Sequence, residues 1–365
     1  MRILRVANVG VWLILAFIFV AGCGDSGSDG KVENRPAPPA AEFPKSQGRP
    51  LADVLNEAGA PSELVLPPAS SVFYKGENRY SFGVFTRGGE PVPDAQVAVY
   101  VSKAPPKTKK PPKPSGASSK GPAGKLATAL SGKAFGPFPA EVESLETEPA
   151  FVAKTTADDP DAASVVYVTD IRFPSNGEWR IGALVKDGDE LTATLLGSAI
   201  VGRCSAAPAF RGFSRTCTGI PRVGQRPPRI HTPTAADVGG DLSKITTRIP
   251  PDTLNKVDFY DVLGKKPIVL LFATPQFCQS RVCGPVVDVA EQVQRDFGDK
   301  AEFIHVEIFK DNDPSKGTNA QVQAFHLPSE PWLFVIDRRG VIRTEIEGAF
   351  NVDELTKAVK GVTGG

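Results

Sequence analysis

Short apolar runs alternate with turn clusters between about residues 62 and 202. Glycine, proline and asparagine separate the runs, and no helical period interrupts them. Several short strands at this spacing predict an antiparallel β-sandwich. The clearest runs are YSFGVFT, AQVAVYVSK, SVVYVTDIRF, EWRIGALVKDG and TATLLGSAIVG.

The pattern changes at about residue 245 to strands that alternate with helices. The predicted strands lie in KPIVLLFAT and AEFIHVEIF, and the predicted helices lie in VVDVAEQVQRDFG and NAQVQAFHL. PWLFVIDRRGVIRTEIEG predicts a hairpin that turns at Arg339-Gly340, and NVDELTKAVKGV predicts a closing amphipathic helix that Asn351 caps. The order β-α-β-α-β-β-α predicts an α/β fold with a mixed central sheet.

We expect the N-terminal 25 residues to lie outside the folded domains. Arg2 and Arg5 precede VWLILAFIFV, which is too short for a normal transmembrane helix and ends in VAGC. VAGC resembles the lipobox of bacterial lipoproteins. The resemblance implies a signal peptide at 1–22, lipid on Cys23, and an extracytoplasmic protein anchored to the cell membrane. The alternative is a plain secretory signal with a chance cysteine.

Composition divides the rest of the chain. Residues 23–61 are expected to be a disordered tether, because Gly, Ser, Pro and charge dominate most of this stretch. The sandwich is expected at 62–202 and is assigned to the immunoglobulin-like type. Its lysine- and proline-rich stretch, 103–125, reads as a solvated insertion, with contact to anionic lipid as the alternative. A linker at 203–220 then leads to the α/β domain at 221–365.

Overall charge argues against one class of partner. Lys and Arg total 42 against 41 Asp and Glu, so we expect no nucleic-acid partner. The single methionine is the initiator, so the chain carries no Met-rich copper-binding surface. We expect no cofactor.

The five cysteines suggest one lipidated residue and two local pairs. They are Cys23, Cys204, Cys217, Cys278 and Cys283. Outside the cytoplasm disulfides persist, and four cysteines remain if the first carries lipid. Cys204 and Cys217 are expected to form a structural disulfide, which contributes about 3 kcal/mol in the chain-entropy model. A metal site is disfavoured there, because no further ligand cysteines or paired histidines lie nearby.

The other pair lies in FCQSRVCGPVVD, between a strand and a helix. A cysteine after an aromatic residue at this junction, with a later proline before a strand, resembles the thioredoxin-like redoxin superfamily. VGQRPPRIHTP resembles the entry segment of that superfamily, so the resemblance covers about 221–365 and implies a thioredoxin fold. SEPWLFVID resembles its cis-proline segment. The resemblance therefore implies a cis bond between Glu330 and Pro331, with the proline against the active-site sulfur and shaping the substrate edge.

The residues themselves agree with redox chemistry. A thiolate is the nucleophile in disulfide exchange, and a helix N-terminus stabilises a nearby anion. Arg281 stands between the two cysteines and adds a positive charge. A second cysteine can resolve the mixed disulfide. We therefore favour thiol-disulfide exchange with extracytoplasmic protein thiols or disulfides, in which Cys278 attacks and Cys283 resolves.

The spacing of the pair departs from the C-G-P-C of thioredoxins. Four residues separate the two cysteines, and CGPV makes Cys283 the nucleophile in one alignment. The alignment through FATPQF makes Cys278 the nucleophile, and we favour it. Pro285 is tolerated only in the first turn of a helix, so the regular helix should start near Gly284. The segment 278–283 is then expected to be irregular.

Three other readings of the pair stay open. In the first, the cysteines are ligands in a copper-binding protein similar to the Sco type, or in a scaffold protein. His326 is then a candidate for a further ligand, whereas His305 is interpreted as a core or sheet-end histidine. Alternatively, the spacing resembles bacterioferritin-comigratory peroxiredoxins and indicates a thiol peroxidase. Leu271 and Pro275 replace the proline and threonine of the peroxide-binding pattern, which argues against this. The last reading is a static structural bridge.

Overall fold

The computed structural model describes residues 32–105, 129–203, 212–215, 217–278 and 280–364. The predicted signal peptide, Cys23 and most of the expected insertion at 103–125 lie outside these residues. Val32–Gly365 form one compact unit. In the part of the chain that the structure describes, no helix combines the length and the apolar character needed to cross a membrane.

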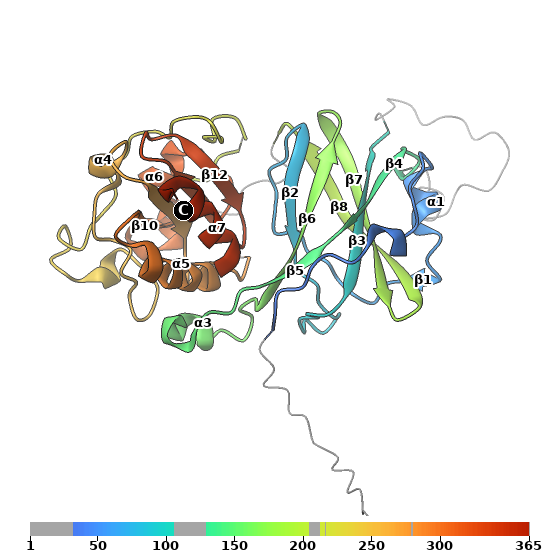
Figure 1. Ribbon diagram of the computed structural model, residues 1–365, viewed down its shortest axis with the longest axis horizontal. Coiled ribbons are helices and arrows are strands. Elements are labelled where there is room, and N and C mark those ends of the chain that lie inside the picture. Colours follow the sequence, from blue (N-terminus) through green and yellow to red (C-terminus); the bar gives the residue numbers. More distant parts are fainter. Residues whose placement is uncertain (1–31, 106–128, 204–211, 216, 279, 365) are drawn as a thin grey trace, which may run out of the picture. The chain divides into compact units, whose positions relative to one another are not determined.

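Two sheets enclose the N-terminal core (Figure 1). One has the order β1-β8-β7-β3-β4 and the other β2-β6-β5, and every neighbouring pair is antiparallel except β1 and β8. The strands are β1 (Ala60–Pro61), β2 (Gly76–Phe82), β3 (Gln96–Lys103), β4 (Ala134–Pro139), β5 (Glu141–Ser144), β6 (Val165–Phe173), β7 (Gly177–Asp187) and β8 (Glu190–Val201). The sequence predicted β3, β6, β7 and β8 closely, and missed β4 and β5.

The predicted tether is wrong for residues 32–61, which are part of the fold. Arg35 exchanges two backbone hydrogen bonds with Val142 of β5. Helix α1 (Leu51–Leu55) buries Leu51 and Val54 completely, and they share a core cluster with Phe43, Tyr100 and Leu184. A few widely spaced apolar residues are enough to order this polar segment, because each packs against the sheet β1-β8-β7-β3-β4.

From residue 268 onward the C-terminal domain has the predicted order of strands and helices, and it is preceded by a short helix, α4, that the sequence analysis missed. Its sheet runs β10-β9-β11-β12, with β9 parallel to β10 and β11 antiparallel to both of its neighbours, so the mixed sheet is confirmed. The Asn351 side chain accepts a hydrogen bond from the Glu354 N–H and caps the last helix, as expected. The elements are α4 (Phe259–Val262), β9 (Ile268–Ala273), α5 (Cys283–Phe297), β10 (Glu302–Glu307), α6 (Ala320–Ala324), β11 (Trp332–Ile336), β12 (Ile342–Glu347) and α7 (Val352–Thr363).

Strand β9 is buried on both faces. Leu271 and Ala273 share a core cluster with residues of α5 and α7, whereas Leu270 and Phe272 share another with Phe259 of α4. Side chains alternate across a strand, so a strand covered on both sides reads as one apolar run. Because β9 is held this way, the chain leaves it from a fixed point just before the cysteine pair.

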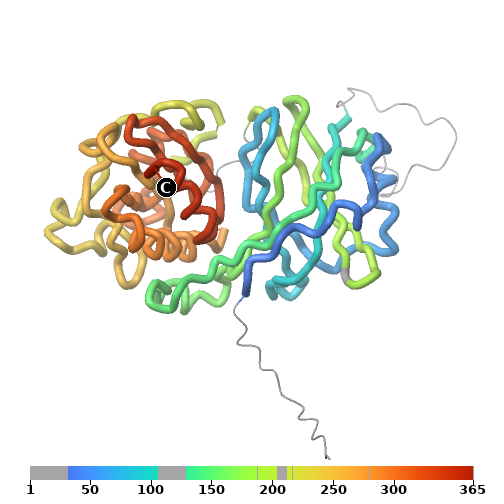
Figure 2. Tube along the Cα trace, viewed as in Figure 1, coloured from blue at the N-terminus to red at the C-terminus, as the bar shows by residue number. Residues whose placement is uncertain are grey.

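Two segments outside the predicted α/β domain pack against it. Phe213, Cys217 and Ile220 join the core beside β9 and α6, so the expected linker at 203–220 is in part core. Residues 145–164, which we name the β5–β6 connection, contact α5 through η2 (Pro149–Phe151) and α3 (Lys154–Ala157). Figure 2 traces this connection in green and α5 in orange. The C-terminal domain therefore packs against segments that the sequence analysis assigned to the linker and to the sandwich.

Candidate redox site

The described residues between the two cysteines, 280–282, lie outside regular helix, as expected. Helix α5 begins at Cys283, one residue before the predicted start, and Pro285 lies in its first turn. Turns and bends lead from the end of β9 to this helix. The first N–H of a helix has no partner within the helix and can bind an anion. Cys278 lies where the N–H of Cys283, the first residue of α5, reaches its sulfur.

The Cys278 thiol is half-buried and surrounded by donors. Its Sγ accepts a hydrogen bond from the backbone N–H of Cys283 at 3.2 Å and lies 3.3 Å from Ser280 Oγ. Burial opposes ionisation of the thiol. Hydrogen bonds from the Cys283 thiol, the Ser280 hydroxyl and the N–H groups of Cys283 and Val282 outweigh it and lower the pKa of Cys278 to about 7.

Cys283 has the opposite environment. Its side chain is fully buried in the cluster formed by Val286, Val287 and their neighbours, and neither Cys278 nor Cys283 is in a disulfide. Burial raises the pKa of the Cys283 thiol, and its hydrogen bond with Cys278 and the nearby charges of Cys278 and Glu330 raise it further. The Cys278 thiol thus ionises near neutral pH, whereas the buried Cys283 thiol stays protonated.

The cysteine segment and the cis-proline segment, which the sequence predicted separately, lie next to each other in the structure. The Glu330–Pro331 bond is cis, as the sequence predicted. Ser280 Oγ lies 3.4 Å from the carbonyl oxygen of Glu330, and the carbonyl of Pro331 accepts from the Gly348 N–H at 2.9 Å. The Ser280 hydroxyl has one proton, which it gives either to the Glu330 carbonyl or to the Cys278 thiolate. Ser280 therefore connects the cysteine segment to the proline segment. The sequence analysis did not single out Ser280, although its place between the cysteines was a usable signal.

The expected role of Arg281 needs correction. Its guanidinium forms an ion pair with Asp161 in the β5–β6 connection, at 2.9 Å between Nη1 and Oδ1. Both side chains are about half exposed. The low pKa of Cys278 comes from hydrogen bonds, and the Arg281 charge is committed to Asp161. No pattern in the sequence pointed to Asp161, which is 120 residues away from its partner.

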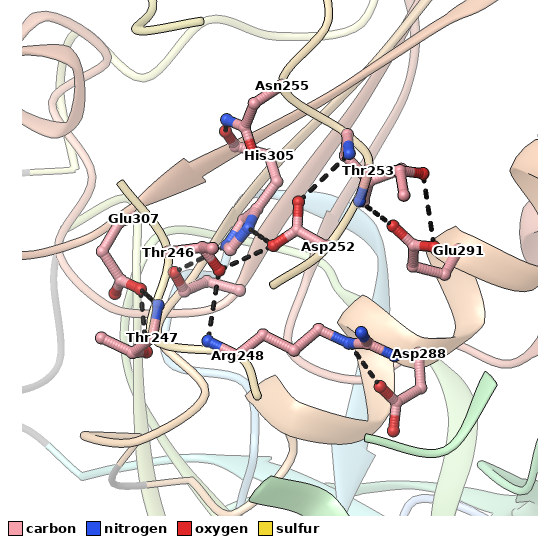
Figure 3. A network of polar contacts seen from close by, with 12 residues as sticks. Thr246, Thr247, Arg248, Asp252, Thr253, Asn255, Asp288, Glu291, His305 and Glu307 are labelled. Carbon is pink, nitrogen blue, oxygen red and sulfur yellow. Dashed lines mark hydrogen bonds and ion pairs between the residues drawn. The ribbon is translucent and has the colours of Figure 1, made fainter. Parts of the chain in front are cut away.

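A buried polar network lies behind the end of β9 (Figure 3). His305 Nδ1 lies 2.8 Å from Asp252 Oδ2, and both side chains are completely buried. Burial disfavours both charges, but each ion stabilises the other. The pKa of His305 is raised to about 9 and that of Asp252 is lowered to about 2. The prediction that His305 is a core histidine is confirmed.

This network supports the chain just before the cysteines. His305 Nε2 lies 3.1 Å from the Ala273 carbonyl oxygen, and Thr247 Oγ1 accepts from the Gln276 N–H at 3.2 Å. The same hydroxyl donates to the buried carboxylate of Glu307. These contacts hold both ends of the stretch between β9 and Cys278. Thr247 and Asp252 come from the irregular stretch before α4, where the sequence shows no periodic signal.

The remaining candidate residues from the sequence analysis are His326 and the pair Cys204 and Cys217. His326 lines a cavity with Lys316, Thr318 and Gln323. Within the residues that the structure describes, no three His, Cys, Asp or Glu side chains gather as metal ligands, so His326 and the cysteines form no such group. Cys217 is disulfide-bonded, and its expected partner Cys204 lies outside the described residues.

Comparisons with known proteins add little. No family model matches the chain, and no curated protein matches it. Among solved structures, it is similar to a thiol:disulfide interchange protein of the thioredoxin family from Chlorobium tepidum. The identity is 17%, the TM-score is 0.26, and the match covers 39% of this chain and 97% of the other.

The donors around Cys278 predict its titration. In a Cys283→Ser variant, which keeps the backbone N–H and puts a hydroxyl donor in place of the thiol donor, the rate of alkylation by iodoacetamide should rise with pH with a midpoint near 7. Ser280→Ala should move the midpoint up by about one pH unit, because a hydrogen bond to the thiolate is lost. Ser280→Thr keeps the hydroxyl and is the control. A midpoint near 8.5 in the parent would contradict this assignment of donors.

Proposed function

We propose that this chain is a thiol-disulfide oxidoreductase that acts on protein thiols or disulfides through the C-x4-C pair Cys278 and Cys283. One observation carries the proposal: the two neighbouring sulfurs differ in both ionisation and exposure. Cys278 is half-buried and its pKa is about 7, whereas Cys283 is buried and its pKa is raised. A partly exposed thiolate beside a fully buried thiol is what a two-step exchange requires.

The exchange conserves atoms and electrons as follows. The Cys278 thiolate attacks a substrate disulfide and forms a mixed disulfide with one substrate sulfur. The substrate S–S bond breaks, and the other substrate sulfur leaves as a thiolate and takes a proton. Cys283 then loses its proton, attacks Cys278 Sγ, and releases the second substrate thiol. Two electrons and two protons pass from the protein dithiol to the substrate disulfide. In the reverse direction a substrate dithiol becomes a disulfide and the protein is reduced.

The surroundings of the pair give each neighbour a role in this scheme. The N-terminus of α5 stabilises the thiolate through the Cys283 N–H, and Ser280 adds a second donor. Glu330 and Pro331 form the edge beside which a substrate segment would lie, and Ser280 Oγ lies within 3.4 Å of both that edge and the Cys278 sulfur. We further propose a lipid anchor on Cys23, an extracytoplasmic location at the membrane and an immunoglobulin-like class for the sandwich; these rest on the sequence alone.

A two-part assay tests the proposal. The purified protein should accelerate the reduction of insulin disulfides by dithiothreitol, and its dithiol should equilibrate with glutathione disulfide to give one intramolecular disulfide. Wild-type protein that does neither would rule out the proposed activity. Tight binding of one Cu(I) per chain by the same inactive protein would favour the metal-carrier reading instead, and hydrogen-peroxide-dependent oxidation of Cys278 far above the rate of a free thiol would favour the peroxidase reading.

A further inference from the structure

The β5–β6 connection reaches the redox site from the sandwich. The backbone N–H of Ala163 donates to the carbonyl oxygen of Arg281 at 3.0 Å, and the Asp161 carboxylate pairs with the Arg281 guanidinium at 2.9 Å. One residue between the two cysteines is therefore held at both its backbone and its side chain. The sandwich also borders Arg281 with Val84 and Phe85, which line the same small cavity.

The residue that is held has an unusual backbone conformation. Arg281 has a φ of 62°, in the left-handed region that non-glycine residues seldom adopt. This turn lies between Ser280 and Val282, and both neighbours donate to Cys278. The geometry of Arg281 therefore sets where the donors on either side of it point.

The connection is anchored firmly enough to hold this turn. At its base, the Leu145 N–H donates to the Ser164 carbonyl at 2.8 Å, and Leu145 belongs to the same core cluster as Cys283. In its middle, the Ala153 N–H donates to the buried carboxylate of Asp288 in α5 at 3.2 Å. Thr156 lies so close to Gly284 that a Cβ there would approach its hydroxyl oxygen to 2.8 Å.

We propose that Asp161 and Ala163 are positioning residues of the redox pair, which keep the donors of residues 280–283 on the Cys278 sulfur and so make the protein disulfide more oxidising. The redox half of this inference rests on the proposed function. Stabilising the thiolate stabilises the reduced form, and a stabilised reduced form raises the reduction potential. The sandwich then contributes to the chemistry of the other domain and is more than a spacer.

Two variants test the inference by two readouts. Asp161→Ala removes the ion pair, and Ala163→Pro removes the N–H donor. The first readout is the pH midpoint of Cys278 alkylation in a Cys283→Ser background. The second is the equilibrium constant for the reaction in which protein dithiol and glutathione disulfide give protein disulfide and two glutathione thiols.

Both variants should move the alkylation midpoint to higher pH. Both should also raise the equilibrium constant for oxidation of the protein, by roughly two- to fivefold for the exposed ion pair. A fivefold rise corresponds to a reduction potential about 20 mV lower. Asp161→Glu should restore both values. Asp158→Ala is the matched control, since Asp158 pairs only loosely with Lys154 in the same connection, at 3.9 Å.

The inference fails if Asp161→Ala leaves both readouts at their parent values, or if Asp158→Ala moves them equally. If Ala163→Pro does not fold, the Asp161 series still decides. A wild-type protein that does not exchange with glutathione would overturn the proposed function. The alkylation midpoints would then still show whether Asp161 positions the donors, because alkylation requires no disulfide partner.

Discussion

Cys278→Ser is expected to reduce disulfide exchange to the rate seen without protein. The attacking group must be a thiolate, and a serine hydroxyl does not ionise at neutral pH. Cys283 cannot replace it, because its side chain is completely buried and its pKa is raised by burial and by its neighbours. The measurement is insulin reduction with dithiothreitol, with circular dichroism to confirm that the variant is folded.

Cys283→Ser should have a different effect that identifies the order of attack. Cys278 keeps the backbone N–H donor of residue 283, so it still attacks. Without the resolving thiol, the variant should accumulate a covalent complex with a disulfide substrate, which dithiothreitol dissolves. Non-reducing electrophoresis shows the complex. If Cys278→Ser traps substrate and Cys283→Ser does not, the assignment is reversed and Cys283 is the nucleophile.

Asp288→Ala is expected to lower the free energy of unfolding by about 3–5 kcal/mol. Asp288 Oδ1 lies 2.9 Å from Arg248 Nε, and both side chains are almost completely buried. Removing the carboxylate leaves the guanidinium charge uncompensated in the interior. It also removes the acceptor for the Ala153 N–H of the β5–β6 connection. Equilibrium urea unfolding, followed by circular dichroism, measures the change.

The same helix offers a matched control. Asp296 also pairs with an arginine, Arg295, but on the surface, where salt and water screen the charges. Asp296→Ala should leave the free energy of unfolding nearly unchanged. Replacing the buried pair together, as Arg248→Met with Asp288→Leu, should recover much of the loss, because no lone charge remains. If the Asp288→Ala variant has the same free energy of unfolding as Asp296→Ala, the predicted contribution of the buried ion pair is wrong.

Much of the C-terminal domain could be predicted from local signals. The apolar run of β9, the Arg339–Gly340 hairpin and the Asn351 cap each depend on neighbouring residues, and the structure has all three. The position of Pro285 similarly predicted where α5 begins to within one residue. Patterns of this kind are readable because their physical cause acts over one or two turns of chain.

The sequence was less informative where packing over long separations decides. Residues 32–61 have the composition of a tether, yet Leu51 and Val54 are buried because the sheet that contains β3 and β7 offers them a surface. His305 could be read as a core residue, but its partner Asp252 could not be named. A charge on an irregular segment has many possible partners, and only the tertiary fold selects one.

The cysteine pair shows which properties follow from the sequence and which follow from the tertiary structure. The sequence by itself determined that Cys278 and Cys283 lie at the junction of a buried strand and a helix, with a cis-proline segment downstream. Only the tertiary structure decided their inequality. Burial of one sulfur, donors around the other, and the tie from Asp161 to Arg281 all come from segments brought together by folding. A pKa depends on what surrounds a group in space, and spacing along the chain does not specify those surroundings.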